Sequence, residues 1–180
     1  ELVDWPERVL TMQRNWIGRS EGARVEFRTE DGAATIPVFT TRPDTLFGAT
    51  FFILAPEHPM VGHLVEGRPQ EAAVREYAAA AARASAADRG ETDRPKTGVD
   101  TGRRVVNPIN GEEIPVWVAD YVLMDYGTGA IMAVPGQDIR DWEFAEEFGL
   151  PIVRTVQPPE DFDGDAFTGD GPAINSGFLD

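Results

Sequence analysis

The sequence contains no cysteine and only two histidines, His58 and His63. The absence of cysteine excludes disulfide bonds, thiolate nucleophiles and cysteine-ligated zinc, and it fits a reducing cytoplasm. Because the two histidines are five residues apart, one helical face cannot present both rings, so a histidine metal site is not expected. We therefore expect a cytoplasmic protein without a bound metal.

Long apolar runs and excess basic residues are also missing. No run of 18 apolar residues occurs, so we expect no membrane-spanning helix. The first ten residues lack the pattern of a signal peptide, and the chain does not begin with Met, so we expect an excised piece of a longer protein. The net charge of −15 argues against a broad nucleic-acid surface, but not against a pocket that grips one end of a nucleic acid.

The chain is long and apolar enough for one domain, with 180 residues of which 42% are hydrophobic. Apolar stretches bounded by turn residues predict short strands at 23–29, 34–41, 48–55, 103–106, 114–119, 130–134 and 152–153. Helical spacing predicts helices after Pro6 and at 58–65, 69–86 and 139–148. This pattern predicts a mixed α/β fold: a small β-barrel core of short strands with peripheral helices.

Residues 126–149 form the stretch that most clearly points to a site. A buried strand ends at Pro135-Gly136, and a helix follows with Asp138 at its N-cap and Asp141 three residues later. Its expected apolar face consists of Ile139, Trp142, Ala145 and Phe148. The two aspartates can cap their own helix, or they can bind a cation, since a buried carboxylate is stable only when it is paired.

Residues 40–45 gather three hydroxyls, a guanidinium and a carboxylate at the end of a predicted strand. The ordinary interpretation is a Pro-Asp turn in which the threonines are simply good strand formers, and the residues alone favour it. The functional interpretation is a group of donors that holds a water and a developing oxyanion.

Three short segments resemble known functional motifs but do not match them fully. Gly127-Thr128-Gly129 lacks the third glycine of a dinucleotide-binding turn. Asp100-Thr101-Gly102 matches the aspartic-protease triplet but occurs once and runs into two arginines. The aspartates at 161, 163 and 165 have calcium-loop spacing, but glycine and glutamate are missing from the required positions.

Longer blocks carry a resemblance that covers almost the whole chain. They are MQRNWIGRSEG (12–22), TTRPDTLFGAT (40–50), APEHP (55–59), KTGVDTG (96–102), NPINGEEIPVWVADYVLMDYGTGAIMAVP (107–135) and DIRDWEFAEEFGLPI (138–152). Together they resemble the editing domain of bacterial leucyl-tRNA synthetases, known as connective polypeptide 1. The valyl enzymes carry a similar threonine-rich block, but the first and fifth blocks look leucyl.

The resemblance implies the editing-domain fold of class I synthetases and hydrolysis of the ester between a wrong amino acid and the 3′-terminal adenosine of tRNA(Leu). It implies that Asp141 holds the substrate ammonium beside Asp138, and that Thr40 and Thr41 orient the ester and the water. Thr45 is expected to exclude leucine. The residues expected to line the amino-acid and adenosine pocket are Arg42, Leu123, Tyr126, Ile131, Met132 and Val134.

The resemblance also sets limits. No cofactor is expected, because ATP and Mg²⁺ belong to the synthetic site of the parent enzyme. The HIGH and KMSKS signatures of that site are absent, so this chain should not make aminoacyl-tRNA. We expect a monomer with an N-terminal linker at 1–22, an editing body at 23–156 and an acidic exit linker at 157–180, both linkers leading to the rest of the synthetase.

One departure keeps an alternative open. Gln137 occupies a position that is usually histidine in the family, which weakens any mechanism that needs an imidazole there. A non-catalytic module that binds the tRNA 3′ end is therefore the main alternative. A homodimeric aspartic protease built on the triplet at residues 100–102 is a remote third.

Overall fold

The centre of the chain is one six-stranded sheet. The structure is a computed structural model that describes residues 6–17, 21–83, 94–125 and 127–180. The strands are ordered β2-β1-β4-β5-β3-β6, and only β3 and β5 pair in parallel. Their bounds are β1 Ala23–Thr29, β2 Thr35–Thr40, β3 Phe51–Leu54, β4 Gly98–Val106, β5 Glu113–Ala119 and β6 Ala130–Ala133. The predicted mixed α/β class is confirmed.

The predicted barrel is not closed. The edge strands β2 and β6 contact each other, yet no ladder pairs them within the described part of the chain. Side chains from both strands, including Thr40 and Met132, line a hollow between them. The core is therefore a curled, open sheet with a seam between β2 and β6, and side chains line the space where backbone pairing would have closed the barrel.

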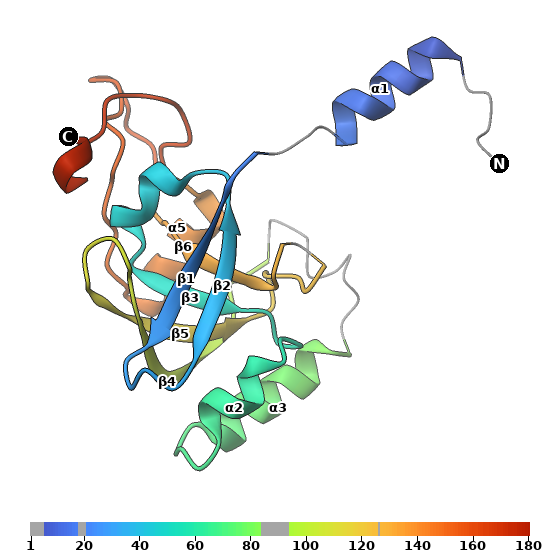
Figure 1. The fold of residues 1–180 in the computed structure, drawn as a ribbon, viewed down its shortest axis with the longest axis vertical. Helices are drawn as coiled ribbons and strands as arrows, with labels where there is room; N and C mark the ends of the chain where they lie inside the picture. The colour runs from blue at the N-terminus through green and yellow to red at the C-terminus, as the bar shows by residue number, and fades with distance from the viewer. Residues whose placement is uncertain (1–5, 18–20, 84–93, 126) are drawn as a thin grey trace.

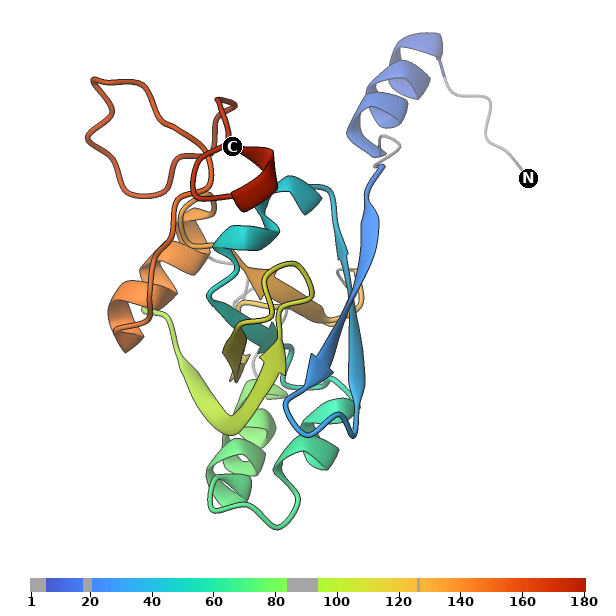
Figure 2. The same ribbon diagram turned by 60° about the vertical axis from the view of Figure 1, so that its left-hand side comes forward.

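Helices lie at the two ends of the sheet, and α5 lies along one side of it (Figures 1 and 2). Helices α2 and α3 pack together at one end, and the short helix η1 lies near the C-terminal segment at the other, while α1 projects away from the body. None of the described helices is long and apolar enough to cross a membrane. Their bounds are α1 Glu7–Ile17, η1 Pro43–Gly48, α2 Met60–Val65, α3 Glu71–Ala81, α5 Ile139–Phe148 and η2 Gly177–Leu179.

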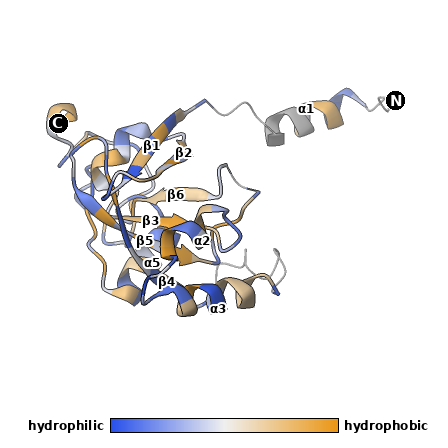
Figure 3. Cartoon of the chain, turned by 60° about the horizontal axis from the view of Figure 1, so that its bottom comes forward, coloured by the Kyte–Doolittle hydropathy of each residue, from blue (hydrophilic) through white to orange (hydrophobic). Residues whose placement is uncertain are grey.

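Strand β3 is buried on both faces and joins the two halves of the core. Phe52 and Leu54 belong to one hydrophobic cluster, while Phe51 and Ile53 belong to the other. Figure 3 shows this strand as a hydrophobic element inside the molecule. Each such side chain contributes about 1.5–3 kcal/mol when fully buried, so β3 anchors the sheet that carries the seam.

The Asp100-Thr101-Gly102 triplet is part of a β-bulge in β4. The register between β4 and β5 shifts between Asp100 and Arg104, and Gly102 has a φ of +69°. The Gly102 N–H donates to the Asp100 carboxylate at 2.8 Å, and the buried Thr101 hydroxyl donates to a β5 carbonyl. The strand continues on both sides of the bulge, so β4 begins at Gly98 rather than at the predicted residue 103.

Two local predictions were wrong. Residues 152–153 form no strand; Val156 instead makes one isolated bridge with Ala173, and the preceding segment packs against the turn before α5. In α5 Asp141, Phe144 and Ala145 are buried and Phe148 packs against the same cluster, so the error in the predicted apolar face is Ile139, which is 53% exposed. Ile139 directly follows the N-cap and faces solvent, so the apolar face is centred on Phe144.

The segment that was predicted to be an exit linker contacts the rest of the chain. Helix α3 is described from Glu71 to Ala81, and the last part of the predicted helix lies outside the described residues. Within residues 157–180, the Phe167 N–H donates to the Gly136 carbonyl and the Phe178 ring packs edge-on against Phe47. The division into two linkers and a body stays a prediction.

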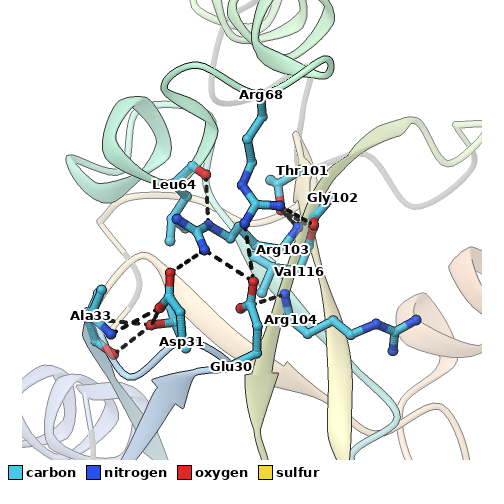
Figure 4. A network of polar contacts seen from close by, with 12 residues as sticks. Glu30, Asp31, Ala33, Leu64, Arg68, Thr101, Gly102, Arg103, Arg104 and Val116 are labelled. Atoms are coloured by element: carbon cyan, nitrogen blue, oxygen red, sulfur yellow. Dashed lines mark hydrogen bonds and ion pairs between the residues drawn. The ribbon is translucent and has the colours of Figure 1, made fainter.

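A network of charged groups ties the β1–β2 turn to the rest of the fold (Figure 4). The guanidinium of Arg103 donates to Glu30 at 3.1 Å and to Asp31, and its Nε donates to the Leu64 carbonyl. Arg68 donates to Glu30 at 3.3 Å. The acids of this turn are therefore paired with cations from β4 and the α2–α3 connection.

Candidate active site

A cleft in two parts lies at the seam between β2 and β6. The larger hollow has a volume of about 430 Å³ and is lined by Val38, Phe39, Thr40, Thr41, Gly127, Ile131, Met132, Asp138, Arg140 and Asp141. The smaller has a volume of about 180 Å³ and is lined by Thr40, Arg42, Thr45, Met132, Val134, Gln137, Asp138 and Asp141. Thr40, Met132, Asp138 and Asp141 line both, so the two hollows are parts of one cleft.

Asp138 caps helix α5. Its backbone is extended (φ −129°, ψ 126°), and its carboxylate accepts the N–H groups of Arg140 at 2.8 Å and Asp141 at 3.2 Å. Gly149 closes the other end in the left-handed conformation. Of the two interpretations of this aspartate pair, capping is therefore correct for Asp138, and Asp141 is not needed for it.

Asp141 is a buried carboxylate held by neutral donors. It is 4% exposed; one oxygen accepts the Tyr121 hydroxyl at 2.9 Å and the other the Val134 N–H at 2.8 Å. Burial and the nearby charge of Asp138 raise the pKa of Asp141 to about 7, although both hydrogen bonds and Arg140 oppose the rise. None of the described cations forms an ion pair with Asp141, so a cation from outside could complete this carboxylate.

The turn after β2 is fixed by its own polar groups. The Thr40 hydroxyl accepts the Arg42 N–H at 3.0 Å, the Thr45 hydroxyl donates to the Arg42 carbonyl at 2.9 Å, and Arg42 is paired with Asp44 at 2.8 Å. Thr45 is 2% exposed, whereas Thr41 is exposed. The ordinary turn interpretation is therefore correct as local structure, and the same turn brings Thr40, Arg42 and Thr45 to the cleft.

The structure brings together most of the predicted site residues. Leu123 is half-buried and does not line the cleft, and Tyr126 lies outside the described residues. The lining residues are Thr40, Thr41, Arg42, Thr45, Ile131, Met132, Val134, Asp138 and Asp141. Their individual roles stay predictions.

Sequence reasoning missed several lining residues and one supporting residue. Val38 and Phe39 directly precede the threonine block, and Arg140 lies between the two aspartates, so adjacency was an available signal. Tyr121, which holds Asp141, offered no comparable signal because it is 20 residues away in the sequence.

The described part of the cleft contains no cluster of three potential metal ligands. Among the described residues, no three histidine, cysteine or acidic side chains are grouped so that they could hold a metal ion. His58 is buried, which lowers its pKa, and its Nδ1 accepts the Met60 N–H at 3.2 Å. This histidine therefore supports the start of α2.

The curled sheet is that of a synthetase editing domain, and comparison with known families specifies which one. Residues 14–180 match the family model described as "Leucyl-tRNA synthetase, editing domain". The chain belongs to this family.

Similar proteins agree with that assignment. The leucine–tRNA ligase of Synechococcus sp. (strain JA-3-3Ab) is 60% identical over 99% of this chain and 21% of its own length. That of Saccharopolyspora erythraea is 56% identical over 98% of this chain and 20% of its own length. The chain thus spans about a fifth of these relatives.

A solved structure has the same fold. The leucyl-tRNA synthetase of Agrobacterium radiobacter K84, crystallised in a ternary complex with tRNA and LeuAMS, superposes with a TM-score of 0.72. It is 44% identical and covers 91% of this chain and 19% of its own. The editing-domain fold expected from the sequence is confirmed.

Proposed function

We propose that this chain hydrolyses the ester bond of tRNA(Leu) charged with a non-cognate amino acid, such as norvaline or isoleucine, and spares Leu-tRNA(Leu). Family membership supports the editing role, and the solved relative that was crystallised with tRNA supports a tRNA partner. The partner group is the 3′-terminal adenosine that carries the amino acid. The domain acts as a monomer without a cofactor, and ATP and Mg²⁺ serve only the parent enzyme's synthetic site.

The physical need for such an activity is a limit on selectivity. A pocket separates amino acids that differ by one methylene by only about 1–3 kcal/mol. A synthetic site therefore charges some wrong amino acids, and a second site of different shape must remove them.

The observation that carries the proposal is the environment of the Asp141 carboxylate. This carboxylate lines both parts of the cleft and is 4% exposed. Among the residues that the structure describes, it receives hydrogen bonds only from two neutral groups, the Tyr121 hydroxyl and the Val134 N–H. The α-ammonium of an aminoacyl ester supplies the missing cation. Each charge-assisted hydrogen bond contributes about 1.5–3 kcal/mol, and the bound ammonium would lower the pKa of Asp141 and keep it ionised.

Thr40 and Thr41, which line the larger hollow together with Asp141, position the reacting groups. Thr40 lines both hollows, and its hydroxyl can donate while its oxygen accepts the Arg42 N–H. Thr40 and Thr41 orient the ester carbonyl and the water. The water oxygen bonds to the carbonyl carbon, and the tetrahedral state then breaks the bond to the ribose oxygen, which leaves with a proton. Positioning of the reacting groups and dipoles directed at the developing charge supply most of the rate enhancement.

Thr45 excludes leucine from the smaller hollow. Its side chain is buried, and its hydroxyl is fixed on the Arg42 carbonyl at 2.9 Å. This hydrogen bond holds the side chain in the path of leucine, which is branched at Cγ. The linear side chain of norvaline meets less of it.

A second candidate function is a module that binds the tRNA 3′ end without hydrolysis. Gln137 favours it, because this residue lines the smaller hollow and its amide cannot act as a general base. Incubation of the chain with norvalyl- and leucyl-tRNA(Leu) separates the two candidates. Selective loss of norvaline supports hydrolysis, whereas binding without loss of either amino acid supports the module and contradicts our proposal.

A further inference from the structure

Tyr121 holds the Asp141 carboxylate but does not line the cleft. It follows the end of β5, is 9% exposed and is absent from the lining of both hollows. Its hydroxyl donates to Asp141 Oδ1 at 2.9 Å. Burial, and then the charge of Asp141, raise the pKa of Tyr121 well above its ordinary value. The hydroxyl therefore keeps its proton and remains a donor to the carboxylate.

The hydrogen bonds to Asp141 fix its carboxylate and leave acceptor capacity for a ligand. An ionised carboxylate has about four acceptor sites, two on each oxygen. Among the described residues, Tyr121 uses one site on Oδ1 and the Val134 N–H uses one on Oδ2. Because each oxygen receives one bond, the group cannot rotate freely, and each oxygen can still accept an N–H from a substrate ammonium.

The Tyr121 ring is itself held by a buried cation. Lys96 precedes β4, and its side chain is 6% exposed. Its Nζ lies 5.8 Å from the centroid of the Tyr121 ring, a cation–π contact, and 3.0 Å from Glu143 Oε2. The ring also packs against Phe144, with the two centroids 5.6 Å apart. Because Glu143 and Phe144 belong to α5, the ring is fixed relative to the helix that carries Asp141.

The other charged groups around Asp141 do not hold its carboxylate in this way. Asp138 and Arg140 lie on the same helix; the first raises the pKa of Asp141 and the second lowers it. Arg42 lines the smaller hollow together with Asp141. Among the described residues, Tyr121 is the one side chain that donates a hydrogen bond to this carboxylate.

We propose that Tyr121 is a positioning residue for hydrolysis: its hydroxyl, with the ring held by Lys96, fixes the Asp141 carboxylate in the orientation that receives the substrate ammonium. This inference rests on the proposed hydrolytic function. Tyr121 does not touch the substrate and transfers no proton to it. A donor to the ionised carboxylate also lowers the pKa of Asp141, so Tyr121 keeps this group ionised at a lower pH than burial alone would allow.

The test compares the parent chain with Tyr121→Phe, which removes only the hydroxyl. In a carbon-13 NMR titration of the free chain, the pKa of Asp141 should rise by about one unit above that of the parent, since one charge-assisted hydrogen bond corresponds to about that shift. At about pH 6 less of the carboxylate is then ionised, and kcat/KM for norvalyl-tRNA(Leu) should fall at least about tenfold. Lys96→Met should shift both quantities in the same direction by less, and parent values would overturn the part assigned to Lys96.

Tyr77→Phe is the matched control. The Tyr77 hydroxyl lies 2.8 Å from the Thr97 hydroxyl and accepts the Asp120 N–H at 3.0 Å. It therefore ties together the two segments that carry Lys96 and Tyr121 without a described contact to the cleft carboxylate. Its loss should reduce stability and leave both the carboxylate pKa and kcat/KM at the parent values.

A kcat/KM for Tyr121→Phe equal to that of the parent would overturn the inference and leave the proposed function intact. A fall in kcat/KM without a change in the pKa of Asp141 would also overturn it, because a merely structural role predicts that result. If Tyr121→Phe does not fold, 3-fluorotyrosine in place of Tyr121 serves instead. Its more acidic hydroxyl is a stronger donor, so the pKa of Asp141 should fall, and an unchanged pKa would overturn the inference.

If the parent itself fails to hydrolyse, the proposed function fails. The positioning role is then judged by the binding, at about pH 6, of norvaline joined through an amide to 3′-amino-3′-deoxyadenosine. Tyr121→Phe should weaken binding at least about tenfold, and Tyr77→Phe should not. Equal affinity of Tyr121→Phe and the parent would overturn the inference.

Discussion

Two acid pairs in this molecule have opposite environments. Glu30 and Asp31 at the β1–β2 turn receive donors from Arg103, and hydrogen bonds outweigh the partial burial of Glu30 to lower its pKa. The pKa of Asp31 falls to about 2, chiefly through the Ala33 N–H and the Thr29 hydroxyl. In the cleft, burial raises the pKa of Asp141 to about 7.

The difference separates acids that are paired with cations of the fold from a buried acid whose hydrogen-bond donors are neutral. Leaving a carboxylate buried without a cation reduces stability, whereas pairing it within the protein offsets part of that cost. The charges of the turn are satisfied by β4 and by Arg68. No described cation pairs directly with the Asp141 carboxylate, and our proposal is that the substrate ammonium supplies this charge.

The largest expected effect is the loss of hydrolysis in Asp141→Asn. The amide keeps the shape and can accept the Val134 N–H while it donates to the Tyr121 hydroxyl, so the fold should persist. Without the charge the ammonium is no longer held in register, and kcat/KM for norvalyl-tRNA(Leu) should fall at least about 10²-fold. Single-turnover deacylation measures this, with Asp31→Asn as the matched control at the other acid pair. Equal rates for parent and Asp141→Asn would remove Asp141 from the mechanism.

The next effect is a change in specificity. Thr45→Ala should admit leucine, so that Leu-tRNA(Leu) is deacylated within about tenfold of the norvalyl rate, since one small steric contact carries a discrimination of about 10–200-fold. Thin-layer or filter assays of both charged tRNAs give this ratio. A variant that still spares leucine as the parent does would show that Thr45 does not exclude it.

Removing the ion pairs of Arg103 with Glu30 and Asp31 should reduce the stability of the fold and leave deacylation unchanged. Arg103→Met leaves Glu30 and Asp31 without their main cation, and the free energy of unfolding should fall by about 2 kcal/mol, between the values for exposed and buried pairs. Urea titration measures it. Arg104→Met removes an exposed arginine from the neighbouring position and should cost less. Deacylation by Arg103→Met should match the parent; a large loss would mean that the two acid regions are not independent.

The smallest effect is a pH dependence of opposite sign in the two regions. Asp141 has a pKa raised from 3.8 to about 7, so its contribution to stability is fully present below about 3.8 and is lost as pH rises through about 7. Asp141→Asn should therefore melt higher than the parent at pH 8, and the difference should shrink toward pH 4. Asp31 has a lowered pKa, so its contribution is present above about 3.8 and is lost as pH falls through about 2. Thermal unfolding across pH tests both; a difference for Asp141→Asn that grows toward acid would contradict the account.

Local signals predicted most of the fold. The hairpin of β1 and β2 and the capped helix α5 are encoded by turn residues, period-two alternation, an N-cap and a final glycine, all of which act within a few residues. The apolar pair at 152–153 was wrongly predicted to be a strand, because a strand also needs a neighbouring strand with which to pair. Its segment packs on the turn at Gly136, where an added Cβ would lie 2.5 Å from the Val153 carbonyl oxygen.

The site could be predicted as a set of residues but not as a geometry. The threonine and aspartate blocks gave most of the lining residues, because adjacent residues on one turn or one helix start reach the same cleft. The open seam, the Tyr121 hydroxyl on Asp141 and the Thr155 hydroxyl on Gln137 could not be predicted, because each depends on contacts between distant parts of the chain.

The most direct test of the central claim is a binding cycle with two ligands and two proteins. The ligands are 3′-amino-3′-deoxyadenosine acylated with norvaline and the same compound acylated with pentanoate, which lacks only the ammonium. Calorimetry should show that the parent chain binds the norvalyl compound at least about tenfold more tightly, the lower end of one charge-assisted hydrogen bond, and that Asp141→Asn loses this preference. A preference of the same size in both proteins would contradict the claim that Asp141 is kept for the substrate ammonium.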